Sequence, residues 1–254
     1  MMQLTTLDNG LRVATRAMAG VETVAIGLYA DAGSRHEPAA LNGIAHLFEH
    51  MVFKGAGGRS ARAIAEVIED TGGDLNAATG REGTVFHARL LAGDLPLGLD
   101  IIADLIRRPH FAEDDLEREK QVVLQELGEA RDTPSDIIFD NLQDAAFPDQ
   151  ALGRPVLGDE DSVNAVTVAD LHGWLTHAYR PGNLVVAAAG KVDHAALVTL
   201  AEARFGDLAP GALDLPEAGR FVGVDRVDRR RAEQAHLTLA MAAPGVRAGD
   251  YYAA

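Results

Sequence analysis

The chain has 254 residues, of which 47% are hydrophobic and 24% are charged, values that are ordinary for a globular protein. Its 38 acidic residues outnumber the 23 basic ones and give a net charge of −15, which argues against a surface for nucleic acid or anionic membrane. Because the chain has no cysteine, disulfides and thiolate zinc sites are excluded, and any metal must be bound by His, Asp or Glu.

Membrane insertion and secretion find no support in the sequence. No apolar run approaches the roughly 18–20 residues that are needed to cross a membrane. The N-terminus lacks the basic region followed by an apolar core that makes a signal peptide. We therefore expect a cytoplasmic protein whose partners include neither membrane nor nucleic acid.

The first elements are predicted to be strands. Residues 4–7 and 11–16 indicate a hairpin, because Asn9 and Gly10 form a typical two-residue turn between them. Residues 21–30 are rich in β-forming side chains and predict a third strand.

The stretch 43–53 predicts a helix with two chemically different faces. His46, Glu49 and His50 fall together on one face, because residues three and four apart are neighbours on a helix. Two imidazoles and a carboxylate that converge in this way suit a zinc site. The opposite face has the spacing of a core stripe, made by Ile44, Leu47, Phe48, Met51 and Val52.

The order of these polar residues, H-x-x-E-H, is the inverse of the H-E-x-x-H motif of zinc proteases. A carboxylate one turn from two metal-binding histidines can take a proton from a water molecule. Chance matches to so short a pattern are common, so the simpler alternative is a solvated helix face that carries three polar residues.

The next elements alternate between helix and strand. Ser60 is a predicted N-cap for a helix over 61–71, which Gly72 and Gly73 end. Residues 74–79 and 84–91 predict two strands, and 95–107 predicts a helix with an apolar face.

A second polar pattern lies on the helix predicted over 111–130. Glu119 and Glu126 are seven residues apart, so they share a face that borders the apolar stripe. A carboxylate in this position is costly to bury unless it is paired or binds a metal. The alternative is a pair of partly exposed surface glutamates. The apolar stripe consists of Leu116, Val123 and Leu127.

The remaining pattern gives helices over 135–146, 167–179 and 193–205 and a buried strand over 184–189. Strands and helices therefore alternate without regular βαβ units, which predicts an α+β fold. Residues 1–208 are expected to form one domain, and 209–233, with their prolines, glycines and charged run, an interdomain linker. Residues 234–254 read as the first strand of a second, truncated domain.

Together these patterns are similar to the N-terminal half of a pitrilysin-type (M16) zinc metallopeptidase, and within that family to bacterial relatives of the mitochondrial processing peptidase β subunit. The resemblance covers positions 4–243. The family has a third zinc ligand, a glutamate, at the distance at which Glu126 follows His50, and a further glutamate where Glu119 stands. The resemblance implies an M16-type domain with a mixed, mainly antiparallel sheet packed by helices, followed by the start of a similar second domain.

The resemblance also implies roles for the site residues. One Zn²⁺ per chain would be held by His46, His50 and Glu126, with the fourth position open, as in catalytic zinc sites. Glu49 would be the general base. Glu119 would support catalysis by orienting the ligands or the attacking water.

The strand over 74–79 resembles the family segment that lies beside the zinc. The resemblance implies that Asn76, Ala77 and Thr79 lie where an extended peptide docks as an added strand. The alternative is that Asn76 ends a loop and Thr79 packs in the interior.

The function implied is zinc-dependent hydrolysis of short or unfolded peptides by an endopeptidase that works as a homodimer or as a heterodimer with a related M16 subunit. One alternative is a non-catalytic structural subunit. The other is the partner-dependent half of a heterodimeric processing peptidase.

Overall fold

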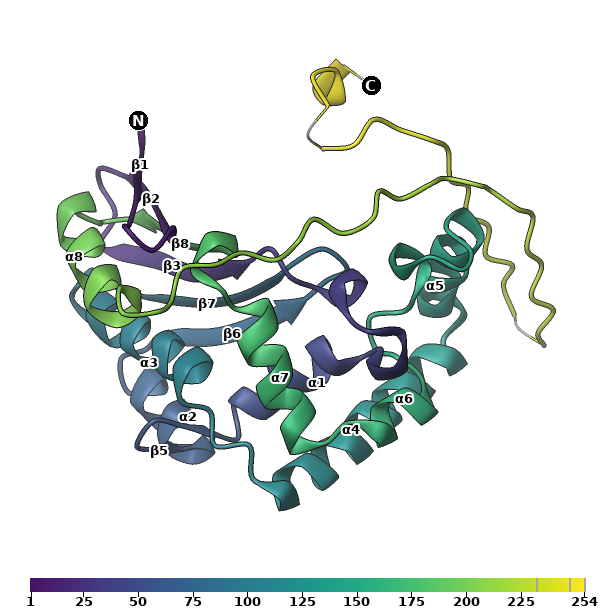
Figure 1. The fold of residues 1–254 in the computed structure, drawn as a ribbon, viewed down its shortest axis with the longest axis horizontal. Helices are drawn as coiled ribbons and strands as arrows, with labels where there is room; N and C mark the ends of the chain where they lie inside the picture. The colour runs from purple at the N-terminus through teal and green to yellow at the C-terminus, as the bar shows by residue number, and fades with distance from the viewer. Residues whose placement is uncertain (232, 247, 254) are drawn as a thin grey trace.

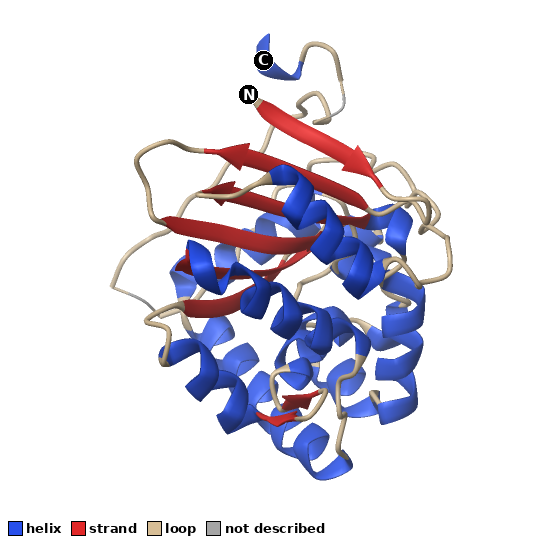
Figure 2. Cartoon of the chain, turned by 90° about the vertical axis from the view of Figure 1, so that its left-hand side faces the viewer, coloured by secondary structure: helices blue, strands red, loops and turns tan. Residues whose placement is uncertain are grey.

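A six-stranded sheet forms one layer of the protein (Figure 2). The computed structural model describes residues 1–231, 233–246 and 248–253. The strand order is β1-β2-β8-β3-β7-β6, and only β2 and β8 are parallel neighbours in it. This mixed, mainly antiparallel sheet confirms the predicted fold class. The strands are β1 Met2–Thr6, β2 Arg12–Ala17, β3 Thr23–Ala30, β6 Asp74–Thr79, β7 Thr84–Leu91 and β8 Leu184–Gly190.

Most of the helices form a second layer below the sheet in the view of Figure 1, with α8 at the left of the sheet and α5 at the right. A two-stranded sheet of β4 (Gly55–Ala56) and β5 (Arg59–Ser60) lies apart from the large one. Within the described ranges, no helix is long and apolar enough to span a bilayer. The helices are α1 Ile44–Val52, α2 Ala61–Glu69, α3 Leu95–Arg107, α4 Glu113–Asp132, α5 Pro134–Ala146, α6 Glu160–Ala165, α7 Val168–Ala178 and α8 His194–Phe205.

One face of the large sheet packs against the helices and the other is more open. Side chains alternate between the two faces of a strand, and along β7 every second residue is buried, from Thr84 to Leu90. The helix α3 contacts β3 and β7, and α8 contacts β2. The apolar core therefore lies between the sheet and the helices.

The helix α1 lies in the middle of the helical layer, where it contacts α4, α7 and β6 (Figure 1). The Phe48 ring stacks on Tyr179 with the ring centroids 4.9 Å apart and meets the edge of Phe111 at 5.6 Å. The core stripe predicted from the sequence is fully buried, as is Ala45 between its members. The apolar face of α1 thus fixes the direction in which its polar face points.

The predicted elements up to residue 205 are present, with ends shifted by a few residues. The predicted caps of α2, α7 and α8 each accept a hydrogen bond from the backbone, through Ser60, Thr167 and Asp193. The sequence analysis missed α6, because a six-residue helix is too short to show a period. The available sequence signal was Asp159, a residue type that caps helices. In the structure its side chain accepts a hydrogen bond from the Ser162 N–H at 2.9 Å.

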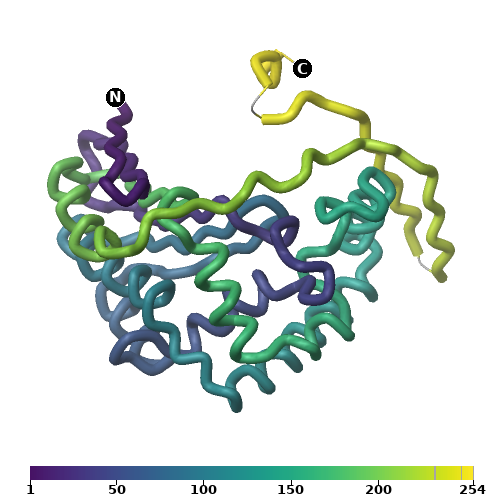
Figure 3. The backbone as a smooth tube through the Cα atoms, viewed as in Figure 1, coloured from purple at the N-terminus to yellow at the C-terminus, as the bar shows by residue number. Residues whose placement is uncertain are grey.

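Residues 209–226 form an irregular strap that runs from α8 to α5 (Figure 3). The side-chain amide of Gln150 binds the strap at Arg220 by two hydrogen bonds. The Nε2 atom donates to the Arg220 carbonyl oxygen at 2.9 Å, and Oε1 accepts from the Arg220 N–H at 2.8 Å. Further along, the Val222 N–H donates to the Ala146 carbonyl at 2.9 Å. This part of the predicted linker has no regular secondary structure and is bound to the surface, and its role as a linker stays a prediction. The domain boundary at 208 stays a prediction.

The strand predicted at the start of residues 234–254 is not formed. Residues 234–243 run as irregular chain, and their apolar side chains are more than four-fifths exposed at Leu237, Leu239 and Met241. A strand needs a neighbour to accept and donate its hydrogen bonds, and no strand of the described residues pairs with this segment. The local sequence of this segment was therefore insufficient to form the strand.

The central position of Phe48 can be tested by unfolding. Phe48→Ala removes a fully buried ring and is expected to lower the free energy of unfolding by about 3–5 kcal/mol. Phe139→Ala is the matched control, because that ring is 62% exposed and its loss should change stability by less than about 0.5 kcal/mol. Denaturant titration measures both, and similar losses for the two variants would contradict this assignment of the core.

Candidate metal centre

The two histidines of α1 and a glutamate of α4 converge on one point. His46 and His50 are one turn apart, with ring centroids separated by 4.6 Å. The Glu126 Oε2 atom lies 3.7 Å from Nε2 of His46 and 3.8 Å from Nε2 of His50. One ligand atom from each residue lies within 4.8 Å of the other two. Ligand atoms of a tetrahedral zinc are roughly 3.3–3.6 Å apart, so this donor set fits the ion after small side-chain movements.

The packing of α4 against α1 brings Glu126 to this point. The buried residues of α4 include Leu116, Val123 and Leu127, the apolar stripe predicted from the sequence. Because α4 contacts α1, the face that borders this stripe is turned towards the histidines. Glu119 and Glu126, two helical turns apart, therefore both reach α1.

Glu119 holds His50 in the orientation that a metal ligand needs. Its side chain is 9% exposed, and its Oε2 lies 3.1 Å from Nδ1 of His50. An ionised carboxylate can only accept this hydrogen bond, so Nδ1 donates it, and in the neutral ring the lone pair would be on Nε2, the nitrogen on the side of Glu126. The other oxygen of Glu119 forms an ion pair with Nζ of Lys54 at 2.8 Å.

Lys54 is a residue that the sequence analysis missed. It follows the end of α1 by two positions, and its ammonium group compensates the charge of the buried Glu119. A basic residue just after a helix that carries a polar motif was the available signal, although a cation at a helix C-terminus is common for other reasons.

His46 is neutral but is held differently from His50. Burial, and then the neighbouring His50, lower the pKa of His46 to about 4, so its imidazole is in the form that binds metals. Its Nδ1 atom is buried and has no hydrogen-bond partner among the described residues. The orientation of the His46 ring therefore depends on its backbone and on packing.

Glu49 lies on the same face of α1 but outside the group of converging ligand atoms. The Thr79 hydroxyl of β6 donates a hydrogen bond to Oε2 of Glu49 at 2.5 Å. Burial raises the pKa of Glu49, and the hydrogen bond from Thr79 lowers it. A carboxylate held beside a metal site with a raised pKa has the properties of a general base.

The three residues predicted to bind substrate lie on β6, which is an edge strand in the sheet order. Thr79 and Ala77 are half-buried and share one face, whereas Asn76 is exposed on the other. The Asn76 side chain accepts a hydrogen bond from the Ala77 N–H at 2.8 Å. Thr79 is thus brought to Glu49, while Asn76 and Ala77 lie along the edge of the sheet.

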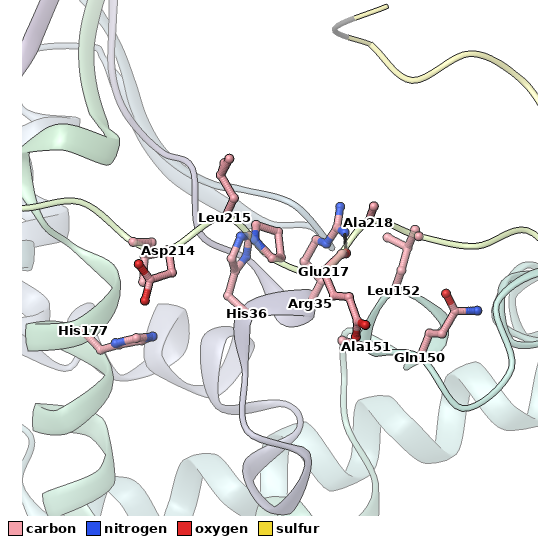
Figure 4. A pocket seen from close by; sticks show the side chains of 13 residues that line it. Arg35, His36, Gln150, Ala151, Leu152, His177, Asp214, Leu215, Glu217 and Ala218 are labelled. Carbon is pink, nitrogen blue, oxygen red and sulfur yellow. Dashed lines mark hydrogen bonds between the residues drawn. The ribbon is translucent and has the colours of Figure 1, made fainter.

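A separate cavity of about 250 Å³ lies under the strap (Figure 4). Strap residues 213–219 line it together with Arg35, His36 and His177 from the body of the protein. None of the site residues predicted from the sequence borders it, so this cavity is distinct from the metal centre.

Comparisons with known proteins place the chain in a family. The family described as Insulinase (Peptidase family M16) matches residues 12–160, and the description Peptidase M16 inactive domain matches 165–254. An uncharacterized zinc protease of Mycobacterium tuberculosis is 40% identical over 247 residues, which cover 95% of this chain and 56% of the relative. The mitochondrial-processing peptidase subunit beta of Mus musculus is 39% identical over 247 residues, covering 96% of this chain and 50% of that protein.

Solved structures agree on the fold. A protease from Helicobacter pylori superimposes with a TM-score of 0.78 at 23% identity, over 87% of this chain and 53% of that one. A peptidase M16 inactive domain from Pseudomonas fluorescens gives 0.79 at 25% identity, over 87% and 54% of the two chains. The chain spans about half the length of these relatives.

The mixed sheet with its layer of helices is the fold seen in structures of M16 peptidase domains. The chain belongs to peptidase family M16, and its relatives include proteins named as zinc proteases. The resemblance found in the sequence is therefore confirmed. The match over 165–254 begins at the last residue of α6 and continues past residue 208, so it does not locate the predicted domain boundary.

The contact between Glu119 and His50 predicts a change in metal affinity. Glu119→Ala frees the His50 ring and leaves Lys54 without its partner, so zinc binding is expected to weaken by about 10- to 100-fold. Glu129→Ala, on the same helix, removes a carboxylate whose described partner is Gln125 and should leave the affinity unchanged. Competition with a chromophoric chelator measures both affinities, and equal values for the two variants would refute the role of Glu119.

Proposed function

We propose that the chain is the zinc-binding half of a metalloendopeptidase that hydrolyses short or unfolded peptides. The observation that supports this most strongly is the convergence of one ligand atom each from His46, His50 and Glu126. Family membership supports a peptidase, and the relatives named as zinc proteases support the metal.

In this proposal one Zn²⁺ per chain is held by His46, His50 and Glu126. When bound, zinc supplies a Lewis acid that polarises the scissile carbonyl and makes water more acidic. The neutral His46, the Nδ1-protonated His50 and the carboxylate of Glu126 are the protonation states that such a donor set requires.

Glu49 takes the proton of the attacking water and transfers it to the leaving amine. Its carboxylate lies on the face of α1 that carries both histidines, where His50 and Glu126 influence its pKa, and the Thr79 hydroxyl donates a hydrogen bond to it. Glu119 and Lys54 maintain the orientation of His50.

The free edge of β6 suits an extended peptide as the substrate. In the described chain this edge has no neighbouring strand, so its backbone groups can pair with a peptide added alongside, largely independently of sequence. Asn76 and Ala77 would then contact the substrate directly. Thr79 would act on the substrate through Glu49.

The relatives suggest how the chain is completed. Proteins named as mitochondrial-processing peptidase subunit beta are 36% and 39% identical to this chain, and a subunit implies a partner. We therefore propose a homodimer or a heterodimer with a related M16 subunit. A non-catalytic structural subunit is the alternative, and the presence of both histidines and all three glutamates favours the enzyme. The cytoplasmic location stays a prediction.

The mechanism is tested by Glu49→Gln. This variant keeps the shape of the side chain but removes the base, so the rate of peptide hydrolysis is expected to fall by at least about 10²-fold. Zinc content should remain near one per chain, whereas His50→Ala should lose both zinc and activity. Cleavage of a fluorescence-quenched unstructured peptide and elemental analysis provide the two measurements. Unchanged cleavage by Glu49→Gln would disprove the mechanism, and a wild-type protein that binds zinc without hydrolysis would favour the structural subunit.

Thr79→Val distinguishes two roles of Thr79. If the hydroxyl orients Glu49, its removal is expected to lower kcat by about 10-fold while KM changes little. If Thr79 contacts the substrate instead, KM should rise while kcat is maintained. Thr15→Val is the control, because its hydroxyl contacts His194 on α8 and lies on β2, away from the edge that β6 forms. Steady-state kinetics on the same peptide decide between the two outcomes.

A further inference from the structure

The N-terminus of α1 is held by a side chain that the function proposed so far does not use. The first backbone N–H groups of a helix have no partner within it. The N-cap of α1 is Gly43, with a φ of 96°, and it has no side chain to cap the helix. The carboxylate of Glu37 takes this role from outside, since it accepts hydrogen bonds from the N–H groups of Gly43 at 2.9 Å and Ala45 at 2.8 Å.

Both oxygens of Glu37 accept hydrogen bonds. Its Oε1 accepts from the Ala45 N–H, and its Oε2 accepts from the Gly43 N–H and from the amide of Asn42, the latter at 2.8 Å. The residue is only 5% exposed. Burial raises its pKa to about 7, while these three hydrogen bonds and the charge of Arg154 favour the ionised form.

The segment after α5 fixes Glu37 in turn. The guanidinium of Arg154 donates to the carbonyl oxygen of Glu37 at 2.7 Å. Asn42 donates to the carbonyl oxygen of Pro155 at 3.0 Å, and its own carbonyl accepts from the Ser162 hydroxyl at 2.7 Å. The cap is therefore part of a buried hydrogen-bond network.

This cap lies directly before a metal ligand. His46 is the third residue of α1, in the turn whose N–H groups Glu37 binds. His50 has Glu119 to hold its second nitrogen, whereas the second nitrogen of His46 has no partner among the described residues. The direction of the His46 ring therefore depends on the backbone of the first turn, which frays easily when its cap is lost.

We propose that Glu37 is a positioning residue of the metal centre, which fixes His46 by capping the first turn of α1 as Glu119 fixes His50 through its ring nitrogen. The inference rests on the proposed zinc site. It assigns a task to a carboxylate that binds neither metal nor substrate.

Glu37→Gln tests this with little change in volume. A glutamine keeps one acceptor oxygen but places an NH₂ group against an N–H donor, so part of the cap must be lost. Asp193→Ala is the matched control, because Asp193 caps α8 by accepting from the Ala196 N–H at 2.8 Å. Both variants weaken a helix N-terminus, but only the first is connected to His46.

The measurement is a titration of the whole chain with cobalt(II), which reports both affinity and the ligand-field spectrum of the site. Glu37→Gln is expected to bind cobalt about 10-fold more weakly and to show altered visible bands. Asp193→Ala should melt at a lower temperature yet keep the affinity and spectrum of the wild type.

The outcomes are separable from those of the proposed function. Wild type that binds no cobalt would overturn the zinc site and this inference together. Wild-type affinity and spectrum in Glu37→Gln would overturn the inference alone. If Glu37→Gln does not fold, Asn42→Ala decides the question, because it removes one of the three hydrogen bonds. A partial loss of affinity in Asn42→Ala supports the role of Glu37, and an unchanged affinity refutes it.

Discussion

The packing of α1 into the core is the constraint on which the candidate metal centre depends. One face of this helix is fully buried, with Phe48 stacked on Tyr179, so the helix cannot rotate without exposing a large apolar surface. Its polar face is consequently directed at α4, where Glu119 and Glu126 approach it. Burial of apolar surface thus orients two histidines and a glutamate together.

Buried charge is tolerated at the site because each group has a partner. Glu119 lies between His50 and Lys54, and Glu49 is hydrogen-bonded by Thr79. In a chain with a net charge of −15, the ammonium of Lys54 compensates locally for a carboxylate that would otherwise be expensive to desolvate. The overall acidity of the protein therefore says little about the electrostatics next to the ligands.

Local periodicity and caps predicted the fold well, and they predicted part of the site. The helix α1 could be predicted from its two faces, and β3 from its β-forming side chains, since these signals are carried by neighbouring residues. The pairing of Glu126 with His50 needed a family resemblance, because no local rule connects positions so far apart. Lys54 and Glu37 were missed, since neither an ion pair with another helix nor a cap supplied from outside the helix leaves a periodic trace, and a basic residue after α1 is only a weak signal. The strand expected near residue 234 is not formed for a different reason. Its local sequence suits a strand, but no strand of the described residues pairs with it.

The strap gives the segment that follows it a fixed starting point. Its backbone is bound at Arg220 by Gln150 and at Val222 by the end of α5, so the chain leaves the body beside α5 and not at the end of α8. The reach of the residues that follow is then measured from this anchor. A shorter free segment keeps the residues that follow the strap on the side of the molecule where α5 lies.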